Sequence, residues 1–120
     1  MTTFGLKQNH IDAINSVFNQ YPEITKATIY GSRAKGNYRN GSDIDLTLTG
    51  KNLNLTTLFK IENQLDDLLL PYKIDISILH KIENPDLVEH IERVGIIFYD
   101  PDTFSGSSVF SRYCGIRRDR

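Results

Sequence analysis

The chain has 120 residues, with 14 lysines and arginines against 15 acidic residues and a formal net charge of −1. This length suits one domain with a single two-layer core. The near-neutral balance gives no basic footprint and argues against general nucleic-acid binding by the whole surface. The single cysteine, Cys114, excludes an internal disulfide. Because no apolar run approaches the roughly 18 residues of a membrane span and the N-terminus lacks a signal-peptide profile, we expect a cytoplasmic protein that does not enter a membrane.

Helical and strand-like segments alternate along the chain. Apolar residues at near-helical spacing predict a first helix from Lys7 to Gln20, which Pro22 ends. The later predicted elements are strands at residues 27–30 and 44–49, a helix at 55–70, a strand at 73–79, a helix from Pro85 to Gly95 and a strand at 96–99. This interleaving of helices and strands indicates an α+β or α/β two-layer domain.

A turn of small residues follows the first predicted strand directly. Gly31 and Ser32 come straight after Tyr30, and the residues from Ser32 to Lys35 can open a short helix. The first N–H groups of a helix have no partner within the helix and can bind a phosphate, and glycine permits close approach. The sequence is not a Walker loop, which requires a lysine and a Ser or Thr after the second glycine. We expect Gly31 and Ser32 to contact phosphates.

Two aspartates lie two residues apart on the second predicted strand. Side chains alternate between the faces of a strand, so Asp43 and Asp45 should point to one face and Ile44 to the other. Neighbouring carboxylates repel each other, and each pKa rises unless a cation neutralises the pair. Oxygen ligands of this kind suit magnesium. The pair therefore predicts a metal site.

A third aspartate, Asp75, lies alone on the apolar strand at residues 73–79. One interpretation is a solvated strand face beside Lys73 and Ser77. If this strand and that of Asp45 are neighbours in one sheet, Asp75 completes a three-carboxylate cluster. Such a cluster is typical of two-metal phosphoryl or nucleotidyl transfer.

These motifs together resemble the nucleotidyltransferase superfamily that includes DNA polymerase beta, and in particular its minimal single-domain MNT proteins. The resemblance covers roughly residues 18–100 and depends on GSRAKG at 31–36, SDIDL at 42–46 and KID at 73–75. It implies a small mixed sheet with helices packed on one face. It further implies nucleotide binding by Gly31, Ser32 and Arg33, and two Mg²⁺ ions held by the three acids. The resulting set of catalytic and metal-binding residues is Asp43, Asp45 and Asp75.

Many MNT proteins are paired, as antitoxins, with a helical HEPN-domain protein. The resemblance therefore implies transfer of AMP from ATP to a hydroxyl of a HEPN partner protein. A single domain of this size has no second domain to grip an acceptor, so a partner or a second copy of the chain, as in a homodimer, must supply it. Two alternatives stay open: a non-catalytic antitoxin that acts by sequestration, and an enzyme that modifies a small molecule such as an aminoglycoside.

The last segment of the chain differs in character from the rest. Residues 103–120 are rich in serine, glycine and arginine and show no apolar periodicity. We expect a nucleotidyltransferase domain at 1–102 and, at 103–120, a flexible basic tail or a segment introduced by cloning.

Overall fold

The computed structural model describes residues 2–39 and 41–102. Its elements are β1 (Thr2–Thr3), β2 (Leu6–Lys7), α1 (Gln8–Phe18), β3 (Lys26–Tyr30), α2 (Ser32–Lys35), β4 (Ile44–Thr49), α3 (Leu55–Asp67), β5 (Ile74–Ile78), the 3₁₀ turn η1 (Leu79–Lys81), α4 (Pro85–Val94) and β6 (Ile96–Tyr99). Every helix and strand expected from the sequence is present, within about three residues of its predicted ends. The elements that the sequence analysis did not predict are the β1–β2 hairpin and η1.

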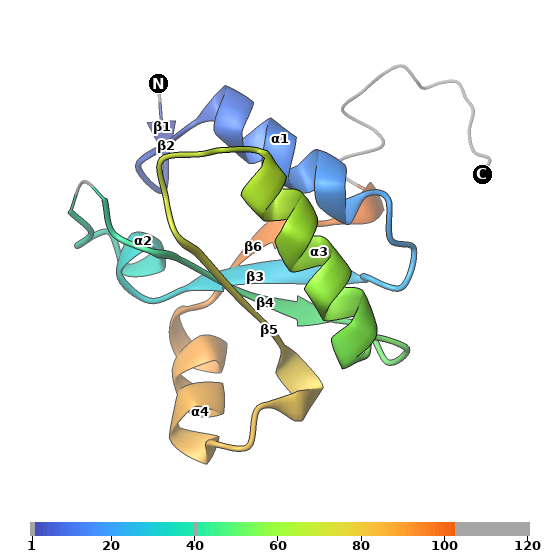
Figure 1. The fold of residues 1–120 in the computed structure, drawn as a ribbon. Helices are drawn as coiled ribbons and strands as arrows, with labels where there is room; N and C mark the ends of the chain where they lie inside the picture. The colour runs from blue at the N-terminus through green and yellow to red at the C-terminus, as the bar shows by residue number, and fades with distance from the viewer. Residues whose placement is uncertain (1, 40, 103–120) are drawn as a thin grey trace.

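The main sheet has four strands in the order β5–β4–β3–β6. Strand β4 runs parallel to β5, and β3 is antiparallel to both β4 and β6. The sheet is therefore mixed, which confirms the fold class expected from the sequence. Figure 1 shows α1 and α3 together on one side of this sheet and α4 apart from them.

The hydrophobic core lies between the sheet and helices α1 and α3. On β4, Ile44, Leu46 and Leu48 are fully buried and belong to this core. Their partners include Ile14 and Phe18 of α1, Ile29 of β3 and Ile61 of α3, all fully buried. Because side chains alternate along a strand, the residues between them point to the opposite face.

That opposite face is polar and partly covered by α4. Thr28 of β3 and Thr47 of β4 are buried there. Helix α4 buries Ile91, and a Cβ added to Gly95 would lie 2.6 Å from the Cγ2 atom of Thr28. Gly95 therefore allows the end of α4 to close against the sheet.

Helix α3 ends three residues earlier than its apolar stripe suggests. Leu69 has a φ of 54°, in the left-handed region, and is 88% exposed. The next residue, Leu70, precedes Pro71, and a residue before proline is biased away from the helical region. Pro71 therefore disfavours a helical Leu70, and the chain has already left the helix at Leu69.

Two expectations concern the whole chain rather than the sheet. Within residues 2–39 and 41–102, no helix is long and apolar enough to cross a membrane. The predicted tail at 103–120 lies outside the described residues. The domain boundary at residue 102 stays a prediction.

Candidate active site

Two of the predicted acids are direct neighbours in the sheet. Strands β4 and β5 pair in register with Asp45 opposite Asp75, and β3 places Tyr30 opposite Asp45 on the other side. Residues in register on adjacent strands share a face of the sheet. Asp45, Asp75 and Tyr30 therefore form one row across three strands, on the face opposite the hydrophobic core.

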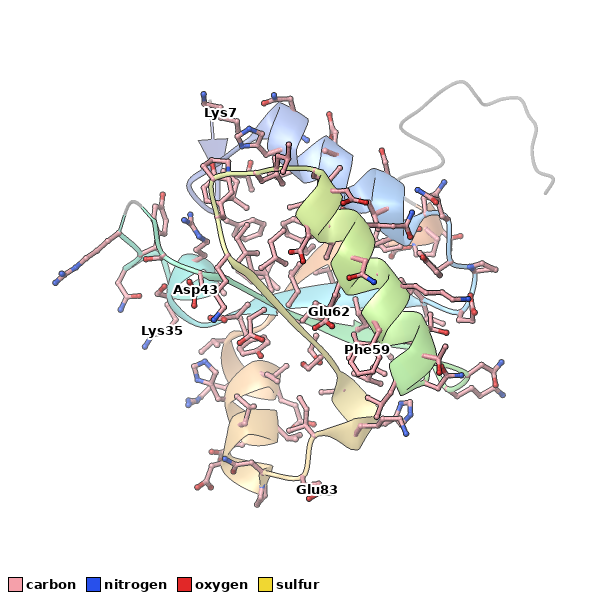
Figure 2. The ribbon with its side chains drawn as sticks, in the orientation of Figure 1. Lys7, Lys35, Asp43, Phe59, Glu62 and Glu83 are labelled. Carbon is pink, nitrogen blue, oxygen red and sulfur yellow. The ribbon has the colours of Figure 1, made fainter. Side chains whose placement is uncertain are left out.

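The third acid, Asp43, precedes β4 and is exposed at the end of the loop that follows α2. Figure 2 shows Asp43 beside α2. The backbone on each side of Asp43 is hydrogen-bonded: the amide of Ile44 donates to Lys73 O at 2.9 Å, and the amide of Ser42 donates to Arg39 O at 3.0 Å. Asp43 thus has a defined backbone position and an exposed side chain.

The three carboxyl groups influence one another electrostatically. Burial raises the pKa of the Asp45 carboxyl above its ordinary value, the Asp75 carboxylate raises it further, and Asp43 adds to the rise. His90 of α4 acts in the opposite direction and lowers the pKa of Asp45. The charges of Asp43 and Asp75 therefore both act on Asp45. A cation near Asp45 would relieve the repulsion among the three carboxylates.

Gly31 lies against the Asp45 carboxylate. Its backbone has φ 75° and ψ −153°, a conformation that almost only glycine adopts. A Cβ at this position would lie 2.5 Å from Asp45 Oδ2, too close for a real side chain. The expected phosphate turn and the expected metal site are thus in direct contact, and glycine is required at this point. Ser32 follows as the first residue of α2.

Residues that the sequence analysis did not assign to the site also border the acids. Burial and the charges of Asp45 and Asp75 raise the pKa of Tyr30, while a side-chain hydrogen bond with Ser77 lowers it. Ser77 Oγ donates in turn to Thr47 Oγ1 at 3.0 Å. These hydroxyls form a polar row beside the acids. The period-2 spacing of Asp75 and Ser77 was the signal that could have predicted this.

His90 approaches the site from α4. Its ring meets the ring of Tyr30 edge to face, with centroids 6.2 Å apart and an interplanar angle of 81°. His90 is also the described residue that lowers the pKa of Asp45. No local sequence signal pointed to it, because its proximity to Asp45 depends on how α4 packs against β3.

Arg33 occupies a different environment from the one expected of a phosphate ligand. Its side chain is 3% exposed. Nε and Nη2 donate to the carbonyl of Ser42 at 3.2 and 2.9 Å, and Nη1 donates to Phe4 O at 2.8 Å. The structure brings Gly31, Asp45 and Asp75 together, with Asp43 close enough to influence Asp45, and directs Arg33 into the interior behind the loop.

The carboxylate oxygens of these acids suit a hard divalent cation, although the side chains do not already have the arrangement of a metal site. Carboxylate oxygens are ligands that Mg²⁺ and Mn²⁺ accept. In the described part of the chain, no group of three or more His, Cys, Asp or Glu side chains already has the arrangement of a metal site. The residues that could hold an ion are Asp43, Asp45 and Asp75, whose charges act on one another.

A separate pocket of 310 Å³ lies at the other end of β4. It is lined by Thr49, Gly50, Lys51, Leu79 and His80. Thr49 is four residues along the strand from Asp45, about 13 Å at the rise of a β-strand. The pocket is therefore distinct from the acidic site.

Comparison with known proteins identifies the class to which this arrangement belongs. The family model described as "Polymerase beta, Nucleotidyltransferase" matches residues 12–104, and the chain belongs to that family. The match spans all of the acids and the Gly31 turn. No curated protein matches the chain.

Solved structures of toxin–antitoxin complexes share the fold. One, determined with AMP-PNP, is 17% identical with a TM-score of 0.62, and the alignment covers 87% of this chain and 85% of that one. The MntA–HepT toxin–antitoxin is 15% identical with a TM-score of 0.59, covering 86% and 84%. A complex of the tri-AMPylated Shewanella oneidensis HEPN toxin with its MNT antitoxin is 14% identical with a TM-score of 0.59, covering 87% and 84%. At these identities the likeness establishes the fold.

Proposed function

We propose that this chain is a magnesium-dependent nucleotidyltransferase that transfers AMP from ATP to a hydroxyl of a HEPN partner protein. The observation that supports this most strongly is the row formed by Asp45 and Asp75 in register, with Gly31 against Asp45. Membership of the polymerase-beta nucleotidyltransferase family supports the reaction class. The proposed acceptor is suggested by structural neighbours that contain AMP-PNP or an AMPylated toxin.

In the proposed site, the turn at Gly31 and Ser32 holds the triphosphate beside the acids. Gly31 has no side chain between the ligand and Asp45, and the first amides of α2 have no helical partners. Bound Mg²⁺ would neutralise the carboxylates and draw charge from the leaving pyrophosphate. Asp43 and Asp45 are the proposed metal ligands, with Asp75 as the third acid.

The proposed transfer is a displacement at the α-phosphorus. The acceptor hydroxyl oxygen forms a bond to that phosphorus, the bond to the bridging oxygen breaks, and pyrophosphate leaves. Asp75 is the proposed base that orients the hydroxyl and receives its proton. Asp75 suits this role because it is exposed at the strand edge of the row, whereas Asp45 is half-buried between β3 and β5.

The chain itself leaves room for an acceptor from outside. Strand β5 is an edge of the sheet, so an incoming protein can reach Asp75 without displacing a neighbouring strand. Helix α4 lies on this face of the sheet, apart from α1 and α3 (Figure 1), and covers part of it. A partner protein therefore fits this site better than an acceptor enclosed by the chain.

The test is incubation of the chain with α-labelled ATP, Mg²⁺ and a candidate HEPN-domain protein. We expect label on the partner with the wild-type chain and none with Asp43→Asn or Asp75→Asn. Unlabelled partner held in a tight complex would contradict transfer and support sequestration instead. Label on an added aminoglycoside, with none on the partner, would contradict the proposed acceptor and retain the reaction class.

A further inference from the structure

Arg33 connects three segments that are far apart in the sequence. Its guanidinium donates twice to Ser42 O and once to Phe4 O, and it lies over the rings of Tyr38 and Tyr72, each centroid 5.2 Å from Cζ. No described acidic residue forms a salt bridge with Arg33. A charge that is 3% exposed is therefore balanced by carbonyl dipoles and aromatic faces.

The Ser42 carbonyl that receives two of these bonds belongs to the residue before Asp43. A fork of two N–H groups fixes the position of an acceptor better than a single donor does. Ser42 is also held by its own turn, because its Oγ accepts from the amide of Arg39 at 2.8 Å. On the other side, Ile44 is fixed to β5 through Lys73. Asp43 is thus the one exposed acid between two anchored neighbours.

The support behind Arg33 is itself well packed. The Tyr72 hydroxyl lies 3.2 Å from His10 Nδ1, and the two rings meet edge to face at 5.5 Å. At Gly5, in the turn between β1 and β2, a Cβ would collide with the ring of Tyr38. The N-terminal hairpin therefore packs against Tyr38 and the Arg33 guanidinium.

From these contacts we propose that Arg33 is a positioning residue for the metal site, acting through Ser42 to set the place of Asp43. This inference depends on the proposed function for the metal it serves. Loss of the fork leaves the charge of Asp43 in place but releases its backbone, so the Asp43 carboxylate is no longer held within reach of Asp45. Residues behind the ligands typically contribute about 10- to 100-fold in metal affinity.

The test measures Mn²⁺ binding directly, by electron paramagnetic resonance of free Mn²⁺ in the absence of nucleotide. Arg33→Lys keeps the charge but cannot form the fork, and Arg33→Met removes both. We expect both variants to bind Mn²⁺ about 10- to 100-fold more weakly than the wild type. The Mg²⁺ concentration for half-maximal transfer should rise in parallel.

Two controls separate positioning from loss of stability and from loss of charge. Leu58→Ala truncates a buried side chain of α3 and destabilises the fold without touching the loop. Arg93→Met removes an exposed arginine of α4. We expect wild-type Mn²⁺ affinity in both. The proposal is overturned if the Arg33 variants bind Mn²⁺ as the wild type does, or if Leu58→Ala weakens binding equally.

A second variant covers the case in which the Arg33 variants do not fold. Tyr72→Leu removes one ring from the guanidinium and leaves its hydrogen bonds, so we expect a smaller weakening in the same direction. Unchanged Mn²⁺ affinity in Tyr72→Leu would then overturn the proposal. If the wild type binds Mn²⁺ but transfers no label, the proposed function fails while the comparison of Arg33 variants keeps its meaning.

Discussion

Asp45 and Asp75 occupy paired positions on the parallel strands β4 and β5, and the charge of Asp75 raises the pKa of Asp45. A fold gains nothing from placing two carboxylates in this way unless something positive joins them, since like charges on adjacent strands are destabilising. The hydrophobic core lies on the other face of the same strands. We therefore expect this row of acids to oppose folding in the metal-free chain, and the proposed function gives a reason for its presence.

Replacement of Asp45 should lower the transfer activity and raise the stability of the metal-free chain. Asp45→Asn removes the repelled charge, so in EDTA at pH 7 we expect a higher melting temperature than that of the wild type. Mg²⁺ should raise the melting temperature of the wild type and have little effect on the variant. Transfer should fall by at least about 10²-fold. Calorimetry with and without Mg²⁺ checks the first two results, and a variant less stable than the wild type in EDTA would contradict them.

The same carboxyl predicts a pH dependence of stability. The pKa of Asp45 is higher in the folded chain than the ordinary value of 3.8. Folding therefore favours its protonated form, and the free energy of unfolding decreases as the pH rises from below 3.8 through the raised pKa. Urea denaturation in EDTA across this range isolates the effect as the difference between wild type and Asp45→Asn. The advantage of the variant should grow with pH and level off, and a constant difference would count against the pKa shift.

Gly31→Ala should damage the site more than its strain alone explains. The φ of 75° with ψ −153° makes the substitution cost on the order of 1–3 kcal/mol, and the new Cβ would also displace the Asp45 carboxylate. Gly36→Ala is the matched control, because Gly36 has φ 86° but nothing within 4 Å of a Cβ. We expect both variants to lose stability in urea titrations and only Gly31→Ala to lose Mn²⁺ affinity. Equal Mn²⁺ affinity in the two would show that Gly31 serves only the turn.

The hydrogen bond between the hydroxyls of Ser77 and Thr47 should contribute more to stability than the hydroxyl of an exposed serine does. Ser77→Ala deprives the fully buried Thr47 of its hydrogen bond and should lower the free energy of unfolding by about 1 kcal/mol. Ser16→Ala is the control, since Ser16 is exposed on α1 and its hydroxyl donates to Asp12 O of the same helix, so a change within about 0.5 kcal/mol is expected. Urea denaturation measures both. A neutral Ser77→Ala would mean that water or Tyr30 replaces the lost donor.

Alternation along single strands explains why the acids could be predicted. Asp43, Asp45 and Asp75 were identified because period-2 spacing assigns a face and because charge is unusual within apolar runs. The pairing of β4 with β5 has to be assumed from the sequence alone, since the register between strands far apart in the chain has no local signal. The structure supplies this register and places Asp45 beside Asp75.

The environment of Arg33 could not be predicted from its own segment of the sequence. Its charge and its position in the GSRAKG turn favour a phosphate ligand. The partners that bury it are Phe4, Ser42 and Tyr72, and two of these belong to segments far from the turn in the sequence. His90 is a similar case, as its proximity to Asp45 depends on the packing of α4. Contacts of this kind arise from tertiary structure and leave no pattern within one segment.

The most direct test of the central claim is calorimetric titration of a non-hydrolysable ATP analogue into the chain, in Mg²⁺ and in EDTA. The account predicts binding that requires Mg²⁺ in the wild type and is lost in Asp45→Asn, which remains folded. Equal binding with and without Mg²⁺, or no binding to the folded wild type, would contradict the claim that these acids hold cations for nucleotidyl transfer.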